Sequence, residues 1–369
     1  METDKIFYYL ALQAVKGLGP VNAKRLLNHF GGAKQILEEH PRNLKMIKGI
    51  GSYLLHQLKN PEIFEKAENE IRFMETKNIT ALCFDDSSYP AKLKHCQDAP
   101  LVLFQRGRIN LNKKRIISIV GTRMMTPYGN RFLKEFVQEI KKFDPVIISG
   151  LAYGVDICAH QEALRQNIST IGVLAHGLDR IYPKLHSGTA SRMMENGGLY
   201  TEFWSGNAPE RENFVKRNRI IAGISDATIV VESAHKGGSL ITAEIAASYN
   251  RDVFAVPGRK DDKFSEGCNM LIKSNKAAMI TSVKDLEYIM GWGVEKPKLH
   301  QGQIEIFVKL DEDEKYLYKS MINSEKILLD QLALESKLSI QKTLMLLLQL
   351  ELKGLVRSLP GKWYEAIQV

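Results

Sequence analysis

The chain has 369 residues and a formal net charge of +9, with 44% hydrophobic and 25% charged residues, as in an ordinary soluble globular protein. Its four cysteines lie far apart, which argues against a metal site and fits a reducing compartment. The acidic start differs from a signal peptide, and no apolar run approaches the roughly 20 residues that span a bilayer. We therefore expect a cytoplasmic protein that makes no membrane contact.

The excess positive charge lies in the middle of the chain. Residues 101–260 contain 22 Lys/Arg and 14 Asp/Glu, whereas residues 311–353 contain 6 basic and 8 acidic residues. A polyanion, if one is bound, is expected to contact the central region.

Residues 1–75 are predicted to form a helical domain, similar to a SAM-like domain. Segments 15–19 and 47–51 each place two glycines in the order apolar-x-Gly-apolar-Gly before a helix, 32 residues apart. This pattern resembles a helix-hairpin-helix motif, in which exposed backbone amides can hold a phosphate. The alternative is that both segments are only tight turns between helices.

Residues 76–104 are predicted as a connector with a strand at 80–84, followed by a Rossmann-like domain over residues 105–292. Apolar, β-branched runs separated by helical patterns indicate an α/β fold with a mostly parallel sheet. The runs occupy residues 116–120, 146–148, 170–174, 227–231 and 253–256.

Residues 293–305 are predicted as a linker and residues 306–369 as a winged-helix domain. Helical patterns at 312–321, 328–336 and 340–352 precede a hairpin made of segments 354–357 and 362–365. Such a domain contacts DNA or protein, or packs as an appendage. Its last two helices are poor in basic residues.

Two loops that follow predicted strands have features of anion sites. The first, Gly121-Thr122-Arg123, lacks the Gly-x-Gly-x-x-Gly fingerprint, so no dinucleotide cofactor is expected. Its Arg123 suits phosphate binding, with a salt bridge as the alternative. The second loop begins with Ser149 and Gly150 and can line an anion site with amides. His160 in the following helix is more typical of a structural residue than of a catalyst.

The densest basic segment is predicted to bind a single strand, because cations meet phosphates while an aromatic ring stacks on bases. A packed basic helix is the alternative, with Arg219 in particular facing inward. A further loop, at Gly238 and Ser239, either holds a phosphate or forms a close strand-to-helix turn. The residues of the basic segment are Arg211, Asn213, Phe214, Lys216, Arg217, Asn218 and Arg219.

These residues resemble the DNA-processing protein A family, also called DprA or Smf. The resemblance rests on ordered segments at 120–123, 149–156, 177–183, 217–223, 238–243 and 254–258. One departure is Val215, which follows Phe214 where the family commonly has proline.

The resemblance implies a non-enzymatic mediator of natural transformation and homologous recombination. Such a protein binds single-stranded DNA without strong sequence preference and loads the recombinase RecA onto it, acts on strands coated by single-strand-binding protein, and dimerises. A DNA-contacting arginine of the family matches Arg123, and Arg211, Lys216, Arg217 and Lys184 are further candidates by position.

Two other functions remain open. One is a nucleotide-binding or nucleotide-processing enzyme related to the phosphoribohydrolase group. In that group's phosphate loop, Leu240 and Ile241 here replace a glycine and a threonine. The other is a small-nucleotide sensor without catalysis. We predict no catalytic residue and no metal.

Overall fold

A computed structural model of the chain describes residues 2–111, 115–293, 310–322, 324 and 326–367. These residues form two compact units, Met1–Met279 and Ile280–Val369, each of which is considered by itself. The linker predicted at 293–305 lies, beyond its first residue, outside the described residues. No helix in the described part of the chain is long and apolar enough to cross a membrane.

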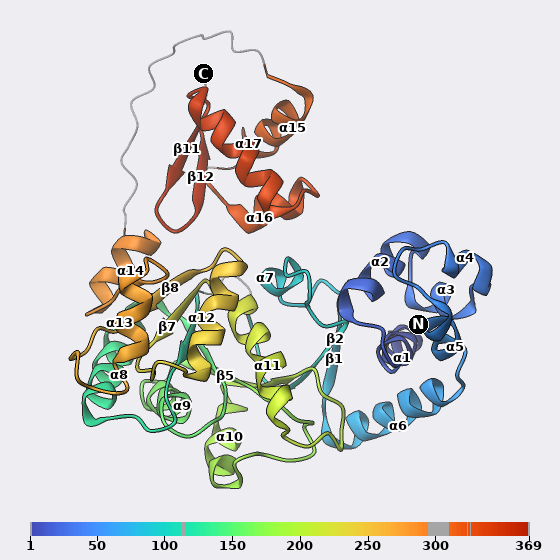
Figure 1. The fold of residues 1–369 in the computed structure, drawn as a ribbon, viewed down its shortest axis with the longest axis horizontal. Helices are drawn as coiled ribbons and strands as arrows, with labels where there is room; N and C mark the ends of the chain where they lie inside the picture. The colour runs from blue at the N-terminus through green and yellow to red at the C-terminus, as the bar shows by residue number, and fades with distance from the viewer. Residues whose placement is uncertain (1, 112–114, 294–309, 323, 325, 368–369) are drawn as a thin grey trace. The chain divides into compact units, whose positions relative to one another are not determined.

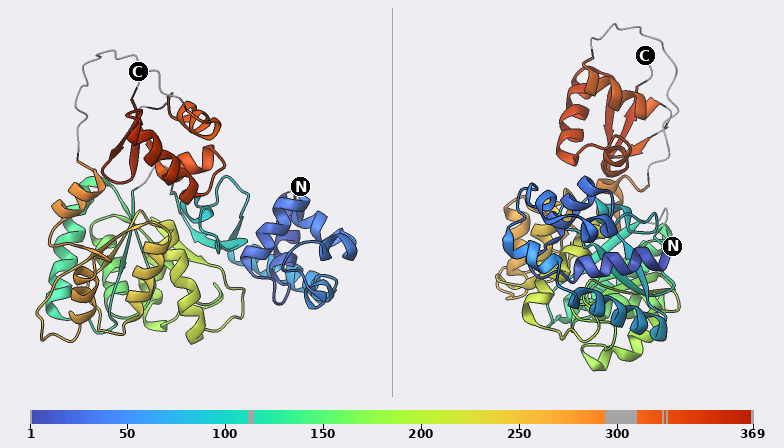
Figure 2. Two further views of the ribbon diagram at one scale, coloured as in Figure 1. Left: turned by 45° about the horizontal axis from the view of Figure 1, so that its top comes forward. Right: turned by 90° about the vertical axis from the view of Figure 1, so that its right-hand side faces the viewer.

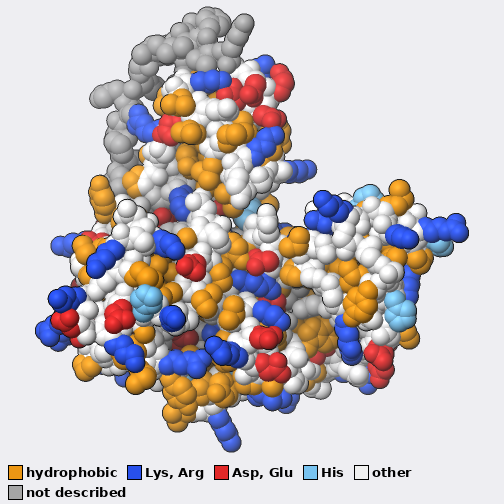
Figure 3. All heavy atoms as spheres, viewed as in Figure 1, with side chains coloured by type: hydrophobic (Ala, Val, Ile, Leu, Met, Phe, Trp, Pro, Cys, Tyr) orange, Lys and Arg blue, Asp and Glu red, His pale blue; other side chains and the backbone are white. Residues whose placement is uncertain are grey.

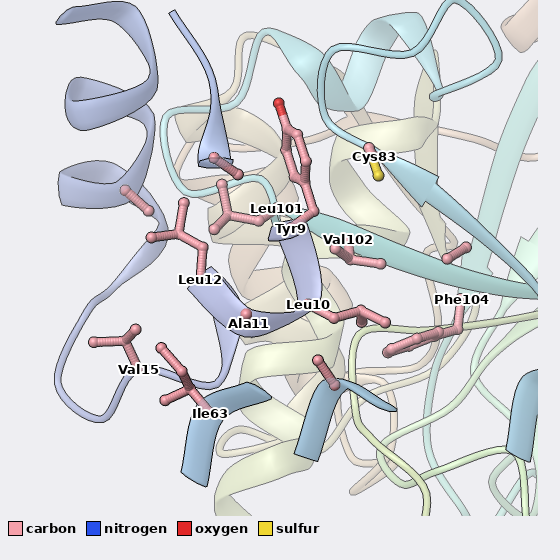
Figure 4. Close-up of a cluster of buried hydrophobic side chains, with 14 of the residues drawn as sticks. Tyr9, Leu10, Ala11, Leu12, Val15, Ile63, Cys83, Leu101, Val102 and Phe104 are labelled. Atoms are coloured by element: carbon pink, nitrogen blue, oxygen red, sulfur yellow. The ribbon is translucent and has the colours of Figure 1, made fainter. Parts of the chain in front are cut away.

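The first unit begins with a helical module (Figure 1). Leu10 and Leu12 of its first helix are fully buried, in a cluster that continues into the first two strands at Cys83 and Val102 (Figure 4). This shared apolar cluster joins the module to the sheet that follows it. The helices are α1 (Glu2–Gln13), α2 (Pro20–Phe30), α3 (Ala33–Glu38), α4 (Pro41–Lys45), α5 (Ser52–Leu58) and α6 (Glu62–Lys77).

A nine-stranded sheet forms the core of the first unit, in the order β1-β2-β6-β5-β4-β3-β7-β8-β9. The pairs β1–β2 and β2–β6 are antiparallel, and all the others are parallel. The strands are β1 (Thr80–Cys83), β2 (Val102–Gly107), β3 (Ile116–Val120), β4 (Val146–Ser149), β5 (Ser169–Val173), β6 (Gly197–Thr201), β7 (Ala227–Val230), β8 (Asp252–Ala255) and β9 (Ala278–Met279).

Helices lie on both faces of this sheet (Figures 1 and 2). Strands β3, β4 and β7 are therefore buried at every residue, which explains why they read as continuous apolar runs. The predicted Rossmann-like fold is confirmed. The helices are α7 (Ala91–Lys94), α8 (Pro127–Ile140), α9 (Val155–Arg165), α10 (Ser187–Met193), α11 (Arg211–Ile224), α12 (Gly238–Ser248) and α13 (Glu266–Lys273).

The sheet is wider than the sequence predicts. The segment predicted as a connector supplies β1 and the start of β2, which extend the parallel sheet with antiparallel strands. At the other end of the domain, helix α14 (Val283–Met290) groups with the second unit, although the predicted Rossmann-like domain runs to residue 292.

The described part of the second unit contains the predicted winged helix. Leu317, Leu332 and Leu347, one from each of its three helices, are fully buried in a common core. The hairpin strands pair in register from Val356–Ala366 to Leu359–Trp363. The elements are α15 (Glu312–Ile322), β10 (Ile327–Leu328), α16 (Leu329–Glu335), α17 (Ile340–Leu352), β11 (Val356–Leu359) and β12 (Trp363–Ala366).

Candidate nucleic-acid interface

The loop after β3 is held in place so that Arg123 projects from it. The Thr122 amide donates to the Glu232 carbonyl at 2.8 Å, and the Thr122 carbonyl accepts from the Val155 amide at 3.1 Å. A methyl group at Gly121 would overlap the Val155 side chain, so only glycine fits there. Arg123 itself is exposed. The carboxyl edge of the sheet therefore presents a guanidinium on a fixed loop.

A buried charged pair lies beneath this loop. Asp156 is 8% exposed and Arg217 is 5% exposed, and a methyl group at Gly150 would overlap both side chains. Burial raises the pKa of Asp156 and lowers that of Arg217, while the opposite charge of each partner counters the shift. Gly150 thus makes room for a pair that places a positive charge under the surface.

Phe214 of α11 lies between two guanidinium groups. Its ring centroid is 5.4 Å from Cζ of Arg123 and 5.8 Å from Cζ of Arg217. Both distances are within the range of cation–π contacts. This arrangement brings together an exposed cation, a buried cation and an aromatic face, three of the features that the sequence predicts for the site.

Two cavities open on either side of Phe214. The larger has a volume of about 360 Å³ and lies between the loops after β3 and β7 and the start of α11. A smaller one of about 40 Å³ shares Arg123, Phe214 and Arg217 with it. Predicted residues in the wall of the larger cavity are Gly121, Thr122, Arg123, Phe214, Arg217, Asn218, Gly238 and Ser239.

The smaller cavity has aromatic walls that the sequence pattern did not lead us to expect. Tyr153 and Tyr182 are both about half exposed, and the Tyr182 ring lies 6.4 Å from that of Phe214, edge to face. The Tyr182 amide donates to Nε2 of His176 at 3.3 Å. Lys184 is exposed just beyond this wall. Both tyrosines stand in segments that carry the family resemblance, so an exposed aromatic next to a basic loop was the available signal.

The loop before α12 is a partial match to its prediction. Gly238 is exposed, with no atom within 4 Å of a methyl group placed on it. Ser239 is 7% exposed, and its hydroxyl donates to Oγ of Ser233 at 2.9 Å. Gly238 is therefore open to a ligand, whereas the Ser239 hydroxyl already has a partner.

The predicted basic surface divides between two sides of α11. Arg211, Phe214 and Asn218 follow one stripe at spacings of three and four residues, whereas Lys216 lies about 200° around the helix from Phe214. Arg219 turns inward, as the alternative interpretation held: it forms an ion pair with Glu202 and donates to the Asp98 carbonyl. Arg219 and Lys216 thus lie away from the cavities.

Three other predicted residues support the site from behind. The hydroxyl of Ser149, which is fully buried, donates to the Ile119 carbonyl at 2.6 Å. Gly150 is buried under the Asp156–Arg217 pair. The side-chain amide of Asn213 donates to the Ala208 carbonyl at 3.1 Å, which holds the loop before α11. These contacts position the loops and leave the three groups turned away from the larger cavity.

His160 is a structural residue of this edge. It is fully buried, with Nδ1 at 2.7 Å from Oγ1 of Thr170 and Nε2 at 2.6 Å from the Gly150 carbonyl. Burial lowers its pKa to about 4, so the ring is neutral near pH 7. It thereby links α9 to the loop that carries Gly150.

Comparison with known proteins agrees with this geometry. A family profile described as DNA recombination-mediator protein A matches residues 80–290. The chain belongs to this family. Protein Smf of Synechocystis sp. is 34% identical over 99% of this chain and the whole of that protein. A second profile, the DprA winged helix domain, matches residues 310–362.

Two solved structures of family members resemble the chain. DNA processing protein A of Streptococcus pneumoniae superposes with a TM-score of 0.64 and 31% identity, over 76% of this chain and 96% of that one. The corresponding protein of Helicobacter pylori gives a TM-score of 0.52 and 29% identity, over 56% of this chain and 93% of that one. The Helicobacter pylori protein is described as having a unique single-stranded DNA binding mode. The winged-helix match agrees with the fold of the second unit.

Proposed function

We propose that this protein binds single-stranded DNA, without strong sequence preference, in the two cavities around Phe214. The observation that carries the proposal is the position of the Phe214 ring between the guanidinium groups of Arg123 and Arg217. A single strand exposes both phosphates and base faces, so it gains from cations and an aromatic ring together. A duplex hides its base faces and gains less from Phe214.

Three further features support this proposal. Tyr153 and Tyr182 add exposed rings beside the shared wall of the cavities. None of the contacting groups reads a base edge in a fixed geometry, which is consistent with weak sequence preference. The Helicobacter pylori relative is described as binding single-stranded DNA.

The proposed role is mediation rather than catalysis. We propose that the protein loads the recombinase RecA onto the bound strand, which single-strand-binding protein coats, and that it acts as a homodimer in natural transformation or homologous recombination. Membership of the DNA recombination-mediator family supports this role. RecA assembly on coated strands, followed over time, tests it: we expect assembly to accelerate with this protein, and an unchanged rate would contradict the proposal.

Affinity as a function of ligand length distinguishes this function from nucleotide binding or processing. Fluorescence anisotropy with labelled oligothymidines is expected to show far tighter binding of strands of some tens of nucleotides than of thymidine monophosphate, with a steep salt dependence. Equal affinity for the mononucleotide would favour the nucleotide-binding alternative.

Arg123→Ala places the site. We expect affinity for oligothymidine to fall by about tenfold or more, because a charge-assisted contact contributes roughly 1.5–3 kcal/mol. The salt slope is expected to fall by about 0.7 for each phosphate that the variant no longer neutralises. Lys216→Ala removes one charge from the opposite side of α11 and is expected to change affinity by less than about threefold. Equal losses in the two variants would mean that the strand follows another path.

A further inference from the structure

The helical module contains a surface that the proposed single-strand site does not use. Residues 5–37 and 40–61 contain no Asp or Glu, although Lys and Arg occur throughout them. Lys16 and Lys48 are both exposed, each directly before the first glycine of one of the two predicted hairpin turns. Within the described residues, neither lysine has a carboxylate partner. This surface is therefore cationic without local neutralisation.

The two turns pack on each other reciprocally. A methyl group at Gly17 would lie 3.2 Å from Tyr53 and 3.4 Å from Leu54, at the start of α5. A methyl group at Gly49 would lie 3.1 Å from Asn22, at the start of α2. Because 32 residues separate Gly17 from Gly49 and also Asn22 from Leu54, the two contacts exchange when the two hairpins are swapped. The module thus has a local pseudo-two-fold axis between its turns.

Both turns are built to stay in this arrangement. Gly17 has φ +81° and Gly49 has φ +95°, a region that residues with a side chain rarely adopt. Nη1 of Arg25 in α2 donates to the Lys48 carbonyl at 2.7 Å, which ties the second turn to the helix after the first. Lys16 and Lys48 also stand 32 residues apart, so the pseudo-two-fold operation exchanges them.

We infer that this hairpin surface is a second nucleic-acid site, and that it binds the backbones of double-stranded DNA. The two strands of a duplex run antiparallel and are related by two-fold axes, so a pair of equivalent cationic turns meets two equivalent backbones. A single strand offers no such symmetry and requires stacking surfaces. Tyr53 is the only strongly exposed Phe, Tyr or Trp of residues 15–58, which leaves phosphate contact as the main interaction.

The space-filling view agrees with this interpretation. Lys, Arg and His side chains lie along the rim of the helical module, while acidic side chains gather at one lower corner (Figure 3). The proposal is independent of the function proposed above, because single-strand binding in the cavities needs none of these residues. The same chain would then hold a single strand at the sheet edge and a duplex at the hairpin surface.

The test compares two double variants of the full chain. Lys16→Ala/Lys48→Ala removes the paired cations, and Lys66→Ala/Lys77→Ala removes two exposed lysines of α6 in the same module. The probes are a labelled blunt duplex of about 20 base pairs and a labelled oligothymidine, both measured by fluorescence anisotropy over a range of salt. Circular dichroism establishes that both variants are folded.

We expect the first variant to lose about tenfold or more in duplex affinity, with a salt slope lower by about 1.8 for two phosphate contacts. Oligothymidine binding is expected to stay within about twofold, and the second variant to match the wild type. Absence of duplex binding in the wild type would overturn the inference. So would equal losses in both variants, or an equal loss of single-strand and duplex affinity in the first.

Discussion

The sheet edge and the winged helix present different surfaces, although both belong to folds that bind DNA. At the sheet edge, Arg123 and Arg211 are exposed beside the ring of Phe214. On the winged helix, the exposed residues of α17 include Met345, Leu348 and Leu352, which are 54%, 58% and 81% exposed. A duplex that approached this helix would meet methyl groups instead of cations.

This difference shows that the fold alone does not identify the DNA site. Lys342, the only basic residue of α17, pairs with Asp313 through a 2.6 Å contact between Nζ and Oδ2. No such neutralisation occurs at Arg123, whose contact is with an aromatic ring. Unpaired cations next to an aromatic surface distinguish the sheet edge from the winged helix.

The largest effect is expected from removing the buried cation of the sheet edge. Arg217→Met leaves Asp156 buried without its partner, so the free energy of unfolding is expected to fall by about 3–5 kcal/mol. Urea denaturation measures this change. Arg211→Met, on an exposed position of the same helix, is expected to stay within about 0.5 kcal/mol.

The partner carboxylate provides a second check on this pair. Asp156→Asn combined with Arg217→Met removes both charges, and we expect it to recover part of the loss. A double variant as unstable as the sum of the single ones would show that the two side chains act independently.

Acidification is expected to weaken the sheet edge next. The pKa of buried His160 is lowered to about 4 from an ordinary value near 6.5, so the unfolded chain takes up a proton that the native chain refuses. The stabilisation is present above pH 6.5 and is lost as the pH falls toward 4, by roughly 3 kcal/mol at most. No histidine occurs in residues 310–367, so the winged helix has no matching contribution.

The measurement is urea denaturation at a series of pH values, with the ring protons of His160 followed by NMR in the native protein. Titration of His160 near pH 6.5 would contradict the prediction. In that case the ring would be hydrated, and its contacts to Thr170 and Gly150 would not hold the edge.

The smallest effect is expected on the winged helix. Lys342→Ala breaks an exposed ion pair with Asp313, which contributes about 0.2–1 kcal/mol to stability. Affinity for oligothymidine is expected to stay within about twofold of the wild type, as measured by fluorescence anisotropy. A tenfold loss would place the winged helix in the single-strand path and remove the contrast between the two regions.

Much of the fold follows from local patterns in the sequence. The central strands are apolar at every residue because helices cover both faces of the sheet. Strand β6 escaped prediction because it begins with Gly197 and Gly198. A methyl group at either position would overlap the backbone of a neighbouring strand, at Thr170 or Arg106. Here glycine marks a close approach between strands, which a propensity for strands does not reveal.

The candidate site is predictable in position and less so in orientation. Arg123, Phe214 and Gly238 stand out because they follow strands or begin helices near other chemistry-bearing residues. The division of α11 into a cavity side and an inward side depends on Glu202 and Asp98, which are remote in the sequence. Nothing within the basic segment itself identifies these partners. The inward orientation of Arg219 therefore required the three-dimensional structure.

The anchoring of Arg219 has a mechanical consequence. Its guanidinium ties α11 to Glu202, directly after β6, and to Asp98, ahead of β2. Strands β2 and β6 are neighbours in the sheet. A pulling force on α11 would thus be shared by two antiparallel strands and their hydrogen bonds instead of loading one loop. A strand under tension could then be held by the Phe214 side of the helix while the Arg219 side carries the load into the sheet.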